Sequence, residues 1–152
     1  MEKFKSIDEI LDYAIKSEQD AVDFYINLAE KTNNVAVKKI FIQNANEEKG
    51  HKLKLQKVKE EKIFSDEFAG GVPDLKISDY TVPKPPSKID DYADALRLAM
   101  HREKGAYKLY TKLSSSTNNS DLKRLFARLA EEEANHKLKF ELEYDEFVLK
   151  DN

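Results

Sequence analysis

The sequence contains no cysteine among its 152 residues. This absence excludes disulfide bonds, thiol catalysis, haem attachment through cysteine and iron–sulfur ligation within the chain. Glycine and proline are scarce, with four of each, whereas 36% of the residues are charged. Such a composition favours long helices. The length suits a single core, so we expect one domain spanning residues 1–152.

Three further features are missing, and each excludes a class of partner or location. The formal net charge is −3 with no basic tract, so we expect no nucleic-acid partner. No apolar run approaches the roughly 18 residues of a membrane span, so we expect no membrane partner. The first ten residues, MEKFKSIDEI, lack the apolar core of a signal peptide. A cytoplasmic location is therefore the expectation.

The helix-breaking residues are concentrated in one segment. All four prolines and a Gly-Gly pair fall between residues 64 and 87. This pattern predicts two helical hairpins, at about residues 6–62 and 89–150, joined by a long connection over residues 63–88. The connection is rich in apolar residues, so we expect it to pack along the helices or to cross to a second subunit.

Capping and turn signals give the expected helices. Ser6 and Glu9 form a capping-box pattern, and Ser87 and Asp90 are capping candidates for the third helix. Asn-rich turns are predicted at two places within the hairpins. The four expected helices therefore cover about residues 6–31, 35–62, 89–115 and 121–150.

The two hairpins form an internal repeat. When residues 11–54 are compared with residues 96–139, at a shift of 85 and without a gap, 18 of the 44 positions are identical. A helical hairpin has been duplicated, and two such hairpins predict an all-α four-helix bundle.

Each predicted helix has an apolar stripe that a glutamate interrupts near its midpoint. Two helices add a histidine three residues later, and the stripe residues of interest are Glu18, Glu48, His51, Glu103, Glu133 and His136. A buried ionised carboxylate is costly unless it is paired. No lysine or arginine lies on the predicted stripes to neutralise the four glutamates. Two divalent metal ions would balance the four negative charges, with both histidines neutral.

The spacing also suits metal binding. Residues three apart on a helix differ by about 60° around the axis and about 4.5 Å along it. Glu48 and His51 can therefore reach one ion, and Glu133 and His136 a second. The other two stripe glutamates would complete the site, with two of the four carboxylates bridging. Oxygen-rich ligation with one imidazole per ion favours iron or manganese and is compatible with zinc.

Two alternatives to this metal site remain. The buried carboxylates could form a network without metal, or the register of the stripes could be wrong. Glu47 and Glu132 could compete as ligands, but they fall off the stripes and are expected to be solvated. His101, two residues before Glu103, is about 200° around the helix from it and is expected at the surface.

The six-residue pattern resembles the ferritin-like di-iron carboxylate superfamily, and its rubrerythrin-like branch in particular. The stretches SEQDAVDFYINLAE and REKGAYKLY are similar to the first and third helices of that branch. The resemblance implies a ferritin-like four-helix bundle with a long crossover connection. It also implies two iron ions as the cofactor. Tyr25 and Tyr110 match tyrosines that lie beside the metal ligands in that family.

The resemblance further implies an oxidoreductase that reduces peroxide or dioxygen. With no cysteine the chain has no rubredoxin domain, so electrons would come from an external donor such as a rubredoxin. Rubrerythrins carry an additional glutamate one turn after the third-helix ligand, where this chain has Ala106. Without that glutamate the predicted site is more symmetric, and in this respect it is similar to the sites of simpler ferritin-like proteins. The alternatives are an iron-binding or sequestration protein with ferroxidase activity only, or a structural di-metal bundle. We expect a homodimer or a larger homo-oligomer.

Overall fold

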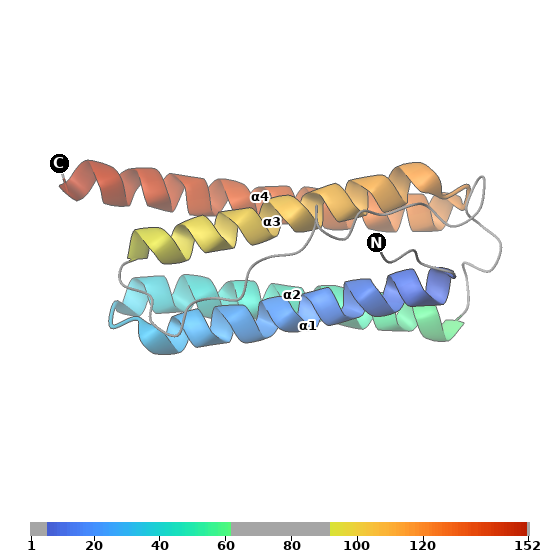
Figure 1. Ribbon diagram of the computed structural model, residues 1–152, viewed down its shortest axis with the longest axis horizontal. Helices are drawn as coiled ribbons and strands as arrows, with labels where there is room; N and C mark the ends of the chain where they lie inside the picture. The colour runs from blue at the N-terminus through green and yellow to red at the C-terminus, as the bar shows by residue number, and fades with distance from the viewer. Residues whose placement is uncertain (1–5, 62–91, 152) are drawn as a thin grey trace. The chain divides into compact units, whose positions relative to one another are not determined.

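The computed structural model of the chain describes residues 6–61 and 92–151. These residues form four helices and no strand (Figure 1): α1 (Ile7–Lys31), α2 (Val35–Glu61), α3 (Tyr92–Ser116) and α4 (Ser120–Asp151). The all-α class and the four predicted helices are confirmed. The predicted connection, 63–88, and the capping candidates Ser87 and Asp90 lie outside the described residues.

The helices belong to two compact units, which correspond to the two predicted hairpins apart from the short turn between α3 and α4. In the first hairpin α1 and α2 run antiparallel, and in the second α3 and α4 do the same (Figure 1). The duplication seen in the sequence is thus a duplication of one structural unit.

Side-chain caps fix where the helices of the first hairpin begin. The backbone N–H of Glu9 donates to the Ser6 hydroxyl at 3.2 Å, so Ser6 is the N-cap of α1 as predicted. The side-chain oxygen of Asn34 accepts from the N–H groups of Ala36 and Val37, at 3.0 and 3.2 Å. These bonds satisfy donors that the first turn of a helix would otherwise leave without a partner.

Each hairpin buries an apolar stripe at helical spacing. On α1 and α2 the fully buried apolar side chains are mainly aliphatic and aromatic, and they include Ile10, Leu11, Tyr25, Leu28, Phe41 and Leu55. On α3 and α4 the corresponding residues are Leu96, Leu109, Tyr110, Leu113, Phe126, Leu129 and Phe140. Burial of this apolar surface is the main favourable term that holds each pair of helices together.

None of the helices in residues 6–61 and 92–151 combines the length and the hydropathy that crossing a membrane requires.

Candidate metal centre

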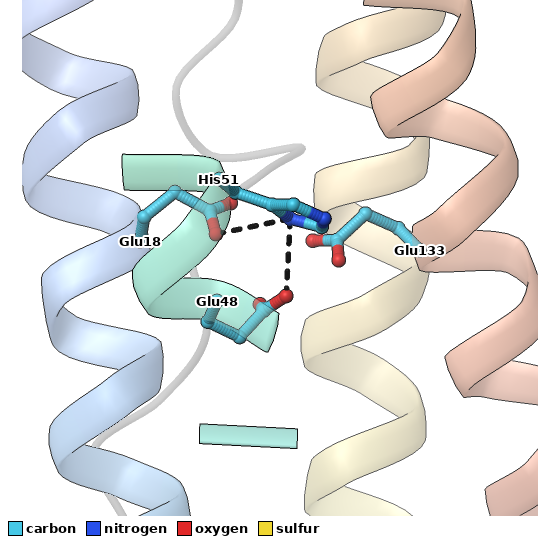
Figure 2. A group of neighbouring side chains, drawn as sticks. All are labelled: Glu18, Glu48, His51 and Glu133. Atoms are coloured by element: carbon cyan, nitrogen blue, oxygen red, sulfur yellow. Dashed lines mark ion pairs between the residues drawn. The ribbon is translucent and has the colours of Figure 1, made fainter. Parts of the chain in front are cut away.

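In the first hairpin, the structure brings together the three predicted ligands Glu18, Glu48 and His51, which we call the first half-site (Figure 2). Both glutamates are completely buried, and His51 is 3% exposed. His51 Nδ1 lies 3.4 Å from Glu18 Oε2 and 3.2 Å from Glu48 Oε1. The i,i+3 spacing on α2 sets the distance between His51 and Glu48, and the packing of α1 against α2 sets the distance between His51 and Glu18.

The second hairpin repeats this arrangement with Glu103, Glu133 and His136, which we call the second half-site. Both glutamates are again completely buried, and His136 is 4% exposed. His136 Nδ1 lies 3.6 Å from Glu103 Oε2 and 3.3 Å from Glu133 Oε1. The two half-sites therefore have the same residue types, the same burial and nearly the same distances.

The donor atoms of each half-site fit a transition-metal ion. Bonds of about 2.0–2.3 Å to such an ion place neighbouring donors roughly 3 Å apart. The carboxylate–imidazole separations of 3.2 to 3.6 Å are of this size. Two carboxylates and one neutral imidazole would balance a divalent ion in charge. Each half-site accordingly offers a suitable set of ligands for one ion.

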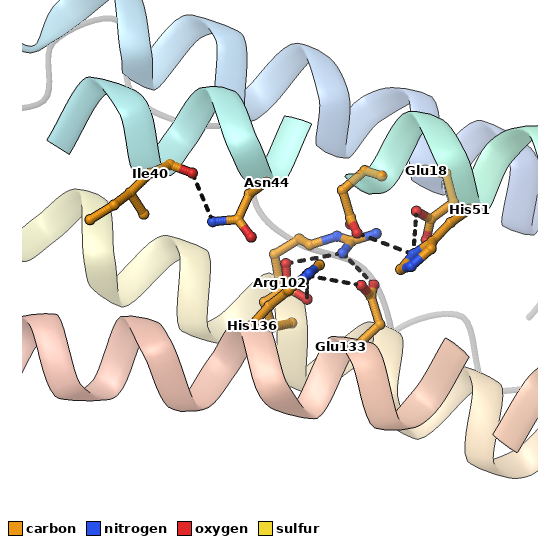
Figure 3. Close-up of polar contacts among 9 residues, drawn as sticks. Glu18, Ile40, Asn44, His51, Arg102, Glu133 and His136 are labelled. Atoms are coloured by element: carbon orange, nitrogen blue, oxygen red, sulfur yellow. Dashed lines mark hydrogen bonds and ion pairs between the residues drawn. The ribbon is translucent and has the colours of Figure 1, made fainter. Parts of the chain in front are cut away.

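One buried residue beside the ligands was missed by the sequence analysis. The expectation that no cation would accompany the stripe glutamates was wrong, because Arg102 on α3 is only 4% exposed. Its guanidinium donates to Glu133 Oε2 at 2.5 Å (Figure 3). It also donates to Glu103 Oε1 at 3.2 Å. Arg102 directly precedes Glu103, so it lies at the edge of the stripe, and its long side chain reaches into the interior.

His101 lies at the surface as expected, whereas Glu47 and Glu132, which were expected to be solvated, are partly covered. Glu132 is within 4.0 Å of Arg128 on the same helix, in an ion pair at the surface. Figure 3 shows a further buried polar group, Asn44, whose side-chain amide donates to the Ile40 carbonyl at 3.1 Å.

The two predicted tyrosines occupy equivalent buried positions. Tyr25 is completely buried and stacks on Phe41, with ring centroids 6.3 Å apart and planes inclined by 16°. Tyr110 is 1% exposed and stacks on Phe126, at 6.4 Å and 13°. Each tyrosine lies two helical turns after a candidate ligand glutamate, so the aromatic pair belongs to the same repeated unit as the half-site.

Comparisons with solved structures identify the fold. The chain is similar to a protein from Thermotoga maritima described as a ferritin-like diiron-carboxylate protein, with a TM-score of 0.79 and 22% identity, over 96% of this chain and 99% of that one. It is also similar to a hypothetical protein from Pyrococcus furiosus, with a TM-score of 0.72 and 33% identity, over 93% and 89% of the two chains. The fold is therefore the ferritin-like four-helix bundle predicted from the sequence.

Comparison with family models identifies the family. Residues 9–144 match the rubrerythrin family model, and the chain belongs to the rubrerythrin family. The chain is also 46% identical over 41 residues to the uncharacterized protein YhjR of Bacillus subtilis, a match that spans 27% of this chain and 28% of that protein. Together with the two buried Glu/His groups, the family indicates a di-metal site.

Proposed function

We propose that the protein is a non-haem di-iron oxidoreductase that reduces hydrogen peroxide or dioxygen. The observation that carries this proposal is the repeated half-site: two carboxylates and one imidazole, buried in the same geometry in each hairpin of a rubrerythrin-family chain. Two bound iron ions would supply two electrons for each oxidant molecule. Reduction of one peroxide to two waters consumes two electrons and two protons.

The ligands proposed for the two ions are the residues of the two half-sites. Glu18, Glu48 and His51 would hold one ion. The three equivalent residues of the second half-site would hold the other. Their burial excludes bulk water from the ligand atoms, which strengthens electrostatic interactions at these positions.

Electrons would have to arrive from outside the chain. The sequence contains no cysteine, and a rubredoxin-type iron site needs cysteine ligands. We therefore propose an external donor such as a rubredoxin. Tyr25 and Tyr110, each packed two turns from a ligand glutamate, would tune the half-sites or relay protons and electrons between them and the rest of the protein.

A second candidate function is iron binding or sequestration, with ferroxidase activity only while iron is loaded. The residue that favours it is Ala106, which is buried one turn after Glu103. A methyl group there provides no additional carboxylate ligand, so the ligand set keeps the symmetry of the repeat. This candidate and the oxidoreductase differ in whether the iron is oxidised once or repeatedly.

Stopped-flow spectroscopy distinguishes the two functions. The protein is loaded anaerobically with ferrous iron and mixed with one equivalent of hydrogen peroxide or dioxygen, and the near-ultraviolet absorbance of ferric iron is followed. The oxidoreductase should be oxidised rapidly by one of these oxidants. It should then turn over many times when reduced rubredoxin and its reductase are supplied.

A single oxidation without turnover, with iron retained or accumulated beyond two ions per chain, would instead support sequestration. A double variant, Glu48→Ala with Glu133→Ala, serves as the control for iron that is bound elsewhere. It should show neither the fast oxidation nor the turnover.

A further inference from the structure

The second half-site has a permanently charged cation beside its carboxylates. Among the lysines and arginines whose side chains the structure describes, only Arg102 is buried, with 4% of its surface exposed. A guanidinium stays protonated in proteins, so its charge of +1 is present at every relevant pH. Because a buried charge is costly unless it is compensated, the position of Arg102 depends on the carboxylates next to it.

Arg102 and His136 lie against different oxygens of the same two carboxylates. Glu133 Oε2 accepts from the guanidinium at 2.5 Å, and Glu133 Oε1 lies 3.3 Å from His136 Nδ1. Glu103 Oε1 accepts from the guanidinium at 3.2 Å, and Glu103 Oε2 lies 3.6 Å from His136 Nδ1. Figure 3 shows Arg102, Glu133 and His136 in this arrangement. Each carboxylate therefore presents one oxygen to a fixed cation and the other to a nitrogen that can bind a metal ion.

The guanidinium and a metal ion would act on the same carboxylates. In the metal-free protein, Arg102 offsets part of the negative charge that Glu103 and Glu133 bring into the interior. A divalent ion bound to these carboxylates would supply positive charge itself and would repel the guanidinium. Arg102 therefore stabilises the metal-free protein more than the loaded protein, whichever metal ion Glu133 ligates.

From these contacts we propose that Arg102 is the counter-ion of the metal-free centre. It compensates Glu103 and Glu133, so that the second hairpin stays folded without metal, and it lowers the affinity of the same carboxylates for metal. The centre can then be emptied and refilled without unfolding. Arg102 acts through the two carboxylates, so it is a positioning residue. This inference rests on the metal centre of the proposed function.

The test compares the metal-free and the Co²⁺-loaded protein, each with and without Arg102. Urea unfolding gives the stability of each form, and anaerobic competition with a chelator gives the affinity for Co²⁺. Arg102→Gln should lower the stability of the metal-free protein and leave that of the loaded protein close to the wild type. It should also bind Co²⁺ at least about tenfold more tightly, since hydrogen bonds to charged groups contribute free energies of this size.

The affinity is the measurement that a merely structural role would not change. If Arg102 only held the helices together, Arg102→Gln would weaken both forms equally and would bind Co²⁺ as the wild type does. Arg102→Lys keeps the positive charge, so it should lie nearer to the wild type in both measurements. Arg97→Gln removes an exposed arginine of α3 that pairs with Asp94, and it should behave as the wild type.

A metal-free Arg102→Gln protein that fails to fold still permits the test. Because Co²⁺ binds the folded state, excess Co²⁺ should then fold this variant, and circular dichroism would detect the gain in helix. A variant that stays unfolded in excess Co²⁺ would overturn the inference, since Arg102 would then be needed in the loaded form as well.

The remaining outcomes separate this inference from the proposed function. Binding of less than one Co²⁺ per chain by the wild-type protein would refute the metal centre itself. Two results would refute the role of Arg102 and leave the metal centre intact. One is an equal loss of stability in metal-free and loaded Arg102→Gln, and the other is an affinity of this variant for Co²⁺ no tighter than that of the wild type.

Discussion

Arg102 donates to Glu133 across the α3–α4 interface at 2.5 Å, with both side chains almost completely buried. Removing one partner of a buried ion pair leaves the other charge uncompensated. In the metal-free protein, Arg102→Gln should therefore lower the free energy of unfolding by about 3–5 kcal/mol. Urea denaturation of the apoprotein measures this change.

The control for this prediction is Arg97→Gln, whose arginine is more than half exposed. It should unfold at the same urea concentration as the wild type, because exposed ion pairs contribute little. An Arg102→Gln apoprotein as stable as the wild type would show that the buried contact contributes nothing net to the fold.

The stacked pairs Tyr25–Phe41 and Tyr110–Phe126 predict matched losses of stability in the two hairpins. Each tyrosine ring is buried, so truncation to alanine leaves a cavity and should cost about 3–5 kcal/mol. Tyr107, which is 43% exposed, provides the control, and Tyr107→Ala should change stability little. Denaturant unfolding of the three variants tests the prediction. A loss in Tyr107→Ala as large as in the other two would contradict the assigned burial.

Gly50 lies in the middle of α2, where a stabilising substitution is expected. A Cβ atom added at this position would meet no atom within 4 Å. Alanine should therefore be accommodated without a clash and should raise the free energy of unfolding by about 1 kcal/mol through helix propensity alone. Lys49→Ala, at an exposed neighbouring position, should have almost no effect. A Gly50→Ala protein that is destabilised would mean that the space beside Gly50 is filled in solution.

Tyr92 at the start of α3 predicts a loss of stability at high pH. Burial of the phenol raises the pKa of Tyr92 above its ordinary value of 10.0, and the nearby charge of Glu143 raises it further. The Tyr92 hydroxyl donates a hydrogen bond to Glu143 at 3.5 Å. The folded protein therefore retains this proton when the unfolded chain has already lost it. The contribution of Tyr92 to stability is complete below the unfolded pKa and declines as the pH rises above it.

The measurement is the change in urea midpoint between neutral and strongly alkaline pH. Tyr92→Phe should lose less stability than the wild type above about pH 10, because phenylalanine has no proton to release. Tyr107→Phe should follow the wild type. An identical alkaline loss in Tyr92→Phe and the wild type would refute the contribution of this group.

The sequence was sufficient to predict the helices and the buried positions of the six candidate ligands, because both depend on periodicity. The apolar stripe and its glutamates recur at helical spacing, and the gapless repeat pairs Glu48 with Glu133 and His51 with His136. Such regularities depend on the direction of each residue from the helix axis, which sequence spacing determines.

Arg102 could not be predicted in the same way. Its position is about 100° around the helix from Glu103, and only the conformation of a long side chain decides whether the guanidinium turns inward or outward. Among the positions at which the repeat differs, a serine at 17 corresponds to an arginine at 102. That difference does not indicate what the side chain contacts, and the hydrogen bonds of Arg102 to Glu103 and Glu133 come from the structure.

The central claim is that each hairpin contributes one half-site for one metal ion. Metal analysis after anaerobic reconstitution with ferrous iron tests it most directly, on the wild type and on Glu48→Ala, Glu133→Ala and His101→Ala. We predict about two ions per chain for the wild type and for His101→Ala, since His101 is exposed, and loss of most of the metal in each glutamate variant. Fewer than one ion in the wild type, or full retention in both glutamate variants, would contradict the account.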